Sequence, residues 1–182
     1  QRQMCIRDRL LMSAKRPIII AGGGVQYSGA VSELTNFAKI HNIPIVETIA
    51  GSAKLLDRDP LNIGPIGVTG SNSANTIANK ADLIIAVGTR LQDFTTGSWT
   101  VFSMDSKFIS INAARHDATK HLSLPIVGDA KLALTILSKA CSGLKASSEW
   151  MSFAQDERKK WDAYVCLLYT SPSPRDTNRS RL

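Results

Sequence analysis

The chain has 182 residues, of which 43% are hydrophobic and 20% are charged, and these values are typical of one globular domain. The formal net charge is +7, but segments 1–9 and 165–182 carry +2 each, which leaves +3 between them. This small excess, without basic residues interleaved with aromatics, gives no support for nucleic-acid binding. No apolar run reaches membrane-spanning length, no signal peptide is recognisable, and Cys141 alone cannot form a disulfide framework. We therefore expect a cytoplasmic protein that binds neither nucleic acid nor membranes.

The two terminal segments differ from the sequence between them. Residues 1–9 and 165–182 show no usable hydrophobic periodicity, and the second contains two prolines, five serines or threonines and three arginines. Both resemble translated sequencing-adapter sequence, so we expect them to be foreign to the fold. A natural basic tail is the alternative for the second segment. The expected domain therefore covers residues 10–164.

Short apolar runs alternate with helical patterns along this domain. Continuously apolar runs predict strands buried on both faces, while apolar residues at spacings of three and four predict the helices between them. A long connection at 48–70 carries prolines and glycines, and Ser71 or Asn72 and Asp129 are expected helix caps. The alternation predicts a doubly wound parallel α/β sheet. The expected strands are 17–21, 43–46, 83–87, 107–111 and 125–127, and the expected helices are 30–41, 71–80, 129–143 and 150–164.

The turn after the first predicted strand contains three glycines, Gly22-Gly23-Gly24. Backbone N–H groups at a strand-to-helix turn can hold a phosphate. The dinucleotide-binding pattern would require a third glycine where Tyr27 stands, although Glu47 lies where a ribose-binding acid is expected. An NAD site is therefore one interpretation. The other is that the small residues let the turn pack closely on the sheet.

Two further loops are candidate ligand-binding segments. Residues 64–73 form a second glycine- and hydroxyl-rich lead into a helix, which could cradle a diphosphate, line a substrate pocket or simply connect two elements. Residues 89–98 follow a buried strand at the edge where α/β sheets bind ligands. Arg90 is the best single candidate for an anion contact there, and a surface salt bridge is its alternative.

The sequence shows no self-contained catalytic set. His41, His116 and His121 are too scattered for a metal site, so we expect them to be structural or exposed. No Ser-His-Asp, Cys-His or paired-carboxylate arrangement can be argued. We expect no catalytic residue and no metal ligand in this chain.

Several segments, taken in order, resemble the central domain of thiamine-diphosphate-dependent enzymes of the acetohydroxyacid synthase group. These enzymes contain three domains, and the resemblance covers nearly all of residues 10–164. Within the family, the run from Thr89 to Trp99 is most similar to hydrolases that open the ring of a cyclic diketone in inositol catabolism. The segments that carry the resemblance are 18–24 (IIIAGGG), 63–70 (IGPIGVTG), 81–97 (ADLIIAVGTRLQDFTTG), 108–112 and 127–129.

The resemblance implies a set of binding residues. Flavin-binding relatives hold FAD through the glycine turn, the glycine-rich loop, the arginine after the third predicted strand and acids after the next two. An aspartate is missing after the fourth predicted strand, where this chain has Asn112-Ala113, and this argues against FAD. Carried across, the cofactor-binding residues would be Gly23, Gly24, Gly67, Gly70, Arg90 and Asp129, and the substrate-facing residues Thr69, Thr89, Thr95 and Thr96.

The same resemblance implies what lies outside this chain. In such enzymes the first domain supplies a glutamate that activates thiamine diphosphate, and the third binds the diphosphate through Mg²⁺ with a Gly-Asp-Gly motif. Neither motif occurs here, so we expect a fragment that lacks its N- and C-terminal domains and is inactive alone. A homo-oligomer is expected, with self-association through 61–68 or 94–102. Three alternatives remain, namely a freestanding FAD- or NAD-binding module, an acetohydroxyacid-synthase-like fragment, and an oligomerisation domain.

Overall fold

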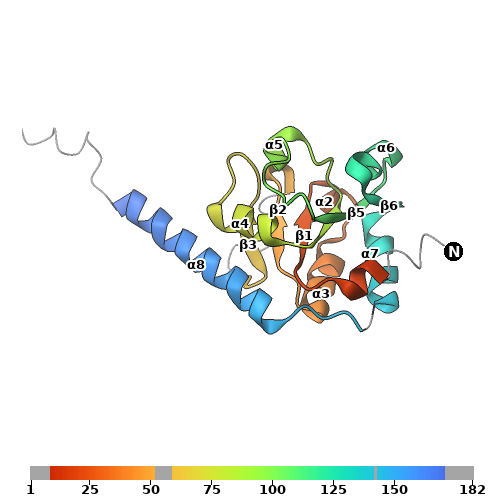
Figure 1. The fold of residues 1–182 in the computed structure, drawn as a ribbon. Coiled ribbons are helices and arrows are strands. Elements are labelled where there is room, and N and C mark those ends of the chain that lie inside the picture. The colour runs from red at the N-terminus through yellow and green to blue at the C-terminus, as the bar shows by residue number, and fades with distance from the viewer. Residues whose placement is uncertain (1–8, 52–58, 142, 171–182) are drawn as a thin grey trace, which may run out of the picture.

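A computed structural model describes residues 9–51, 59–141 and 143–170, in which six parallel strands form one sheet (Figure 1). The strand order is β3-β2-β1-β4-β5-β6. The first three strands are therefore added toward one side of the sheet and the last three toward the other, and the order of the strands reverses between β1 and β4. The expected doubly wound parallel α/β fold is confirmed. The strands are β1 (Pro17–Ala21), β2 (Ile45–Glu47), β3 (Asn62–Pro65), β4 (Leu83–Val87), β5 (Lys107–Asn112) and β6 (Leu124–Val127).

Helices cover both faces of this sheet. Helix α3 packs against α7, and α4 packs against α8, so that one pair lies on each side of the strands (Figure 1). Residues 9–13 add a short helical turn before β1. The remaining elements are α2 (Gly24–Tyr27), α3 (Val31–His41), η1 (Ile49–Gly51), α4 (Asn72–Lys80), α5 (Asp93–Thr96), α6 (Arg115–Ala118), η2 (Lys120–Leu122), α7 (Ala130–Ala140) and α8 (Ser148–Thr170).

The central strands are apolar because both of their faces are covered. All five residues of β1 and all five of β4 are buried. The two strands pair in register from Pro17 opposite Leu83 to Ala21 opposite Val87. Their continuous apolar runs are therefore what a doubly covered parallel sheet requires.

Polar anchors fix the ends of these elements. The Asp82 carboxylate accepts hydrogen bonds from the amides of Lys15 and Arg16 at 2.8 and 2.9 Å, which ties the start of β4 to the start of β1. Both predicted helix caps are confirmed, since Ser71 accepts from an amide of α4 and Asp129 from an amide of α7. These side chains satisfy amides that a helix start leaves unpaired.

The strand β3 was not expected, because it lies inside the predicted long connection 48–70. Its sequence, Asn-Ile-Gly-Pro, has one strand-forming apolar residue and three residues of types that are depleted in strands. Pro65 is tolerated because β3 is an edge strand, and pairing with β2 holds the segment in place. Tertiary pairing therefore overrode a weak local signal.

Two helix ends also differ from the predictions. Helix α7 ends at Ala140 with Cys141 as its cap, before the expected stop at Gly143. Helix α8 does not end at Tyr164 but continues to Thr170, and so enters the segment expected to be foreign. No proline or glycine lies between Ser148 and Pro172, so no helix-breaking residue ends α8 near Tyr164. The expectations for residues 1–8 and 171–182 lie outside the described residues.

Candidate functional site

The predicted cofactor-binding residues all follow strands at one edge of the sheet. Gly23 and Gly24 come after β1, Gly67 and Gly70 after β3, Arg90 after β4, and Asp129 after β6. In parallel sheets the carboxyl ends of the strands share an edge, and ligands bind there, next to the reversal of strand order. This chain places that reversal between β1 and β4. The edge from β3 to β6 is therefore the candidate site.

The centre of this edge is closed by glycines from two strands. A Cβ atom on Gly24 would lie 2.7 Å from Cα of Gly88, and one on Gly88 would lie 2.7 Å from the backbone of Gly24. Gly88 also has φ +60°, a conformation that other residues rarely adopt. Gly88 is not among the residues predicted from the sequence to form the site, although its place at the end of an apolar run was a usable signal.

Two of the three amides of the glycine turn are already occupied. The Gly22 amide donates to Val87 O and the Gly24 amide to Gly88 O, both at 2.9 Å. A phosphate cradle requires such amides to point outward. The structure therefore favours the packing interpretation of this turn over the phosphate-binding one.

Glu47 is engaged with a neighbouring strand of the sheet. It is buried, and its Oε2 accepts a hydrogen bond from Nδ2 of Asn62 on the neighbouring strand at 3.3 Å. A ribose-binding carboxylate must present free acceptor oxygens to hydroxyls at the edge. The position of Glu47 gives the NAD interpretation no support.

The glycine-rich loop after β3 packs against the loop after β4. Gly67 has φ +116°, and a Cβ atom there would lie 3.0 Å from Cα of Thr95. The Val68 amide donates to Phe94 O at 3.0 Å, and the Asn75 side chain both accepts from the Gly67 amide and donates to its carbonyl. Two segments predicted separately thus form one surface.

The four predicted substrate-facing threonines divide into two pairs. Thr69 is exposed and Thr95 half-buried, so both lie at the joined loops within reach of a ligand. Thr89 and Thr96 are buried, and their hydroxyls accept hydrogen bonds from the amides of Leu91 and Trp99, both at 3.3 Å. The hydroxyls of Thr89 and Thr96 therefore bind the backbone of the loop after β4.

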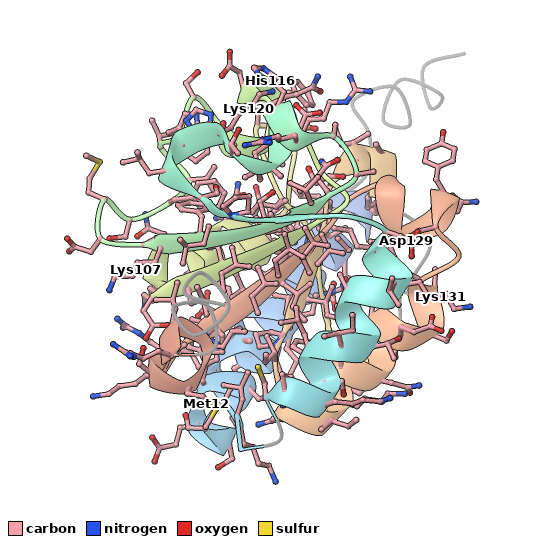
Figure 2. The ribbon with its side chains drawn as sticks, turned by 90° about the vertical axis from the view of Figure 1, so that its right-hand side faces the viewer. Met12, Lys107, His116, Lys120, Asp129 and Lys131 are labelled. Atoms are coloured by element: carbon pink, nitrogen blue, oxygen red, sulfur yellow. The ribbon has the colours of Figure 1, made fainter. Side chains whose placement is uncertain are left out.

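The two charged candidates are exposed. Arg90 forms no ion pair with a carboxylate in the described part of the chain, so the salt-bridge alternative finds no partner there. Asp129 stands at the start of α7 (Figure 2), where its Oδ1 accepts from the Leu132 amide at 3.0 Å. It thus caps a helix whatever else it binds.

The residue that replaces the acid of flavin-binding relatives is engaged within the protein. Asn112 Nδ2 donates to Thr89 O at 3.0 Å, and its Oδ1 accepts from the Ala114 amide at 3.0 Å. This side chain ties the ends of β4 and β5 together. Nδ2 can only donate and Oδ1 already accepts one hydrogen bond, so Asn112 offers a cofactor hydroxyl fewer acceptor sites than a carboxylate would. The expectation against FAD stays a prediction.

Thiamine diphosphate and its Mg²⁺ would need a set of oxygen donors, which we sought among the described residues. Among residues 9–51, 59–141 and 143–170, no three His, Cys, Asp or Glu side chains gather as metal ligands. A magnesium site is built mainly from carboxylate oxygens together with the phosphates. No step of the cofactor's chemistry is therefore assigned to the described residues, and the absence of the cofactor from this chain stays a prediction.

The three histidines occupy separate places. His41 is buried, packs on Phe37 and contacts Leu144 O through Nδ1 at 2.8 Å. His116 and His121 are exposed. Burial, followed by the charge of Lys120, lowers the pKa of His121 below its ordinary value.

No helix within the described ranges has the length and apolar content needed to cross a membrane.

Comparison with known proteins identifies relatives of the whole domain. A 3D-(3,5/4)-trihydroxycyclohexane-1,2-dione hydrolase of Clostridium botulinum is 44% identical over 153 residues, covering 84% of this chain and 24% of that protein. The proteins of the same name from Geobacillus thermodenitrificans and Bacillus thuringiensis are 45% and 38% identical, over 74% and 88% of this chain and 21% and 25% of theirs. The chain thus spans about a quarter of the length of these curated relatives.

The match to a protein family agrees with the fold and with the order of the edge loops. Residues 9–137 match the family described as the thiamine pyrophosphate enzyme central domain, which includes every strand from β1 to β6 and most of α7. The resemblance stated from the sequence is thereby confirmed. This chain belongs to the thiamine pyrophosphate enzyme central-domain family.

Proposed function

We propose that the chain is the central domain of a thiamine-diphosphate- and Mg²⁺-dependent hydrolase that acts on 3D-(3,5/4)-trihydroxycyclohexane-1,2-dione, and that it is inactive alone. The observation that carries the proposal is the 44% identity to the hydrolase of that name along 84% of this chain. Because the relatives are about four times longer, the proposal includes N- and C-terminal domains as partners. The cytoplasmic location and the place in inositol catabolism stay predictions.

Within such an enzyme the described residues supply a scaffold and one wall of the site. The joined loops after β3 and β4 offer the exposed Thr69 and the half-buried Thr95, and the exposed Arg90 follows β4 directly. Thiamine diphosphate, where bound, supplies the chemistry of C–C cleavage. The part proposed for this chain is to position the substrate through hydroxyl hydrogen bonds and one cationic contact.

A chimeric enzyme tests the substrate. Residues 9–164 of this chain would replace the matching segment of the Clostridium botulinum relative, and ring opening of the dione would be measured with thiamine diphosphate and Mg²⁺. We expect activity within about tenfold of the parent, since a small change in positioning costs of this order. A folded, cofactor-loaded chimera that does not open the ring would contradict the proposal. A matched control carries the central domain of an acetohydroxyacid synthase and should be inactive on this substrate.

The chain alone tests the second half of the proposal. Purified protein with thiamine diphosphate and Mg²⁺ should show no ring opening, and calorimetric titration with FAD and with NAD should give no binding heat. Turnover by the isolated chain would overturn its proposed inactivity. Binding of either dinucleotide would instead favour the freestanding nucleotide-binding module, which no observation of the edge supports at present.

A further inference from the structure

A stacked pair of rings joins the loop after β4 to the loop after β5. The Trp99 ring of the first loop lies against the His121 imidazole of the second, with ring centroids 3.5 Å apart and planes inclined by 40°. Trp99 also contacts the Phe108 ring of β5 edge-on, at a centroid distance of 5.5 Å. These three rings, with Phe102 and Leu124, line an apolar hollow of about 460 Å³ at the β5–β6 end of the sheet. The stack thus ties the His121 turn to a ring that β5 supports.

The backbone is strained on both sides of the stack. Ser98 and Trp99 have φ values of 52° and 69°, and His121 and Leu122 have φ values of 55° and 59°. Bulky residues rarely occupy this left-handed region. Such strain persists where surrounding contacts hold it, and it gathers at functional segments. Because both strained pairs meet at the stacked rings, opening of the stack would let both turns relax.

The backbone next to the stack is hydrogen-bonded to a residue of the candidate site. The Trp99 amide donates to Oγ1 of Thr96 at 3.3 Å, and the Val101 amide donates to the Thr96 carbonyl at 3.2 Å. Thr96 is buried and directly follows Thr95, the half-buried threonine of the joined loops. A shift of Trp99 therefore disturbs the turn that presents Thr95.

The surroundings of His121 disfavour a positive charge on its ring. Burial is the largest cause that lowers its pKa and the Lys120 charge is the next, whereas the Asp93 carboxylate raises it. Lys120 is itself paired with Asp117 at 2.7 Å. The neutral ring is therefore favoured in the stack and the protonated ring in water. The charged groups around His121 come from α5, α6, η2, the loop before β5 and β5 itself, and they are Asp93, Asp117, Lys120, Asp105 and Lys107.

We propose that His121 is a positioning residue, which holds the loop after β4 through its stack on Trp99 and releases this loop when it takes up a proton. The part that concerns Thr95 and the substrate rests on the proposed function, whereas the proton-dependent stack does not. A group that binds its proton more tightly in the released state shifts the equilibrium toward release as the pH falls. Attraction between an imidazolium and the tryptophan ring acts in the opposite direction. The sign of the response is therefore the decisive observation.

Fluorine NMR of the full 182-residue chain, with 5-fluorotryptophan in place of tryptophan, tests the stack. The chain contains three tryptophans, and the signal that Trp99→Phe lacks is the signal of Trp99. The comparison variant is His121→Asn, because asparagine tolerates the left-handed backbone and does not titrate. Between about pH 7 and about pH 5, the range in which histidine titrates, the Trp99 signal of the parent should move to its position in His121→Asn. In His121→Asn the signal should not move.

A variant at the adjacent residue is the matched control. Leu122→Asn changes a position with φ 59° and a fully exposed side chain, and it leaves the imidazole in place. Its Trp99 signal should follow the pH as in the parent. The signals of Trp150 and Trp161 should keep their positions, which separates release of the loop from unfolding. A Trp99 signal that does not move, that moves away from its position in His121→Asn, or that moves together with both others would overturn the proposal.

Hydrogen exchange tests whether the stack holds the backbone of the loop. The amides of Trp99 and Val101 should exchange at least about tenfold faster in His121→Asn than in the parent at neutral pH, because their bonds to Thr96 open more often. The Gly22 amide, which donates to Val87 O at the centre of the sheet, should exchange at the same rate in both. Equal rates for the two loop amides would overturn the positioning role.

Turnover by the chimeric enzyme tests the effect on the substrate. At about pH 7, His121→Asn should lower kcat/KM for the dione about tenfold. At about pH 5 the parent and the variant should approach the same value, because the parent has then released the same loop. A loss that is equal at both pH values would show a merely structural contribution and overturn the proton-dependent role. A chimera without ring opening would contradict the proposed function, while the fluorine signal would still decide whether a proton opens the stack.

Discussion

The centre of the sheet and its β5–β6 end differ in how completely their strand residues are buried. Between β1 and β4, glycine backbones lie in direct contact and every strand residue is buried. At the β5–β6 end the first two residues of β5 are not buried, all of β6 is at least partly accessible, and an aromatic hollow stays open. The centre of the sheet is thus closed by contacts within one chain, whereas the β5–β6 end keeps an apolar hollow open at the surface.

Substitution of Gly88 by alanine should have the largest effect and would break the tight centre. The left-handed backbone costs a residue with a Cβ roughly 1–2 kcal/mol, and the overlap with Gly24 adds about 1–3 kcal/mol. We expect the free energy of unfolding in urea to fall by about 3 kcal/mol or more.

Two other glycines separate these causes. Gly29 has φ +59° but no atom within 4 Å of an added Cβ, so Gly29→Ala should cost only about 1–2 kcal/mol. Gly128 has neither constraint, and Gly128→Ala should change the stability by less than about 0.5 kcal/mol. Equal losses for Gly88→Ala and Gly29→Ala would show that the close contact between β1 and β4 contributes nothing.

Loss of the buried helix cap Ser71 should lower the stability more than loss of the exposed helix cap Asp129. Ser71 is buried, and its hydroxyl accepts from the Ala74 amide and donates to Pro65 O at 3.1 Å each. Asp129 is exposed at the β6 end, and its side chain accepts from the Leu132 amide at 3.0 Å. We expect Ser71→Ala to cost about 1–2 kcal/mol and Asp129→Ala about 0.5–1 kcal/mol in urea unfolding. The opposite order would argue that the exposed end is as tightly held as the covered one.

The smallest expected effect is the pH dependence of His121, which lines the hollow. Burial, followed by the Lys120 charge, lowers its pKa in the folded protein below the value of about 6.5 in the unfolded chain. Above that pH both states are neutral. As the pH falls below it, the unfolded chain takes up the proton first, so the free energy of unfolding decreases until the folded pKa is passed.

The variant His121→Asn should remove this part of the slope between about pH 7 and pH 5, because asparagine does not titrate in that range. Asparagine also tolerates the positive φ, so the substitution should not disturb the backbone. Urea unfolding of the parent and of the variant across this range provides the measurement. An unchanged slope in His121→Asn would mean that the hollow does not influence the titration.

Much of the fold could be predicted from the sequence, because the signals that indicate it lie within single helices and strands. The apolar runs at β1 and β4 correspond to strands covered on both faces, and the caps Ser71 and Asp129 act within their own helices. The motifs that carry the family resemblance are contiguous segments, so they too can be read without the structure. The prediction of a long connection at 48–70 was wrong at β3, because pairing with β2 holds that segment despite its weak strand sequence.

The order of residues along the chain therefore determined the fold class, the family and the edge at which the candidate residues lie. Only the tertiary structure decided that Gly24 and Gly88 close the centre of that edge, that Glu47 faces Asn62, and that Thr89 and Thr96 are buried. It alone also brought Trp99, Phe108 and His121 around one hollow. These features depend on contacts between residues far apart in sequence, and neither hydrophobic periodicity nor a contiguous motif carries that information.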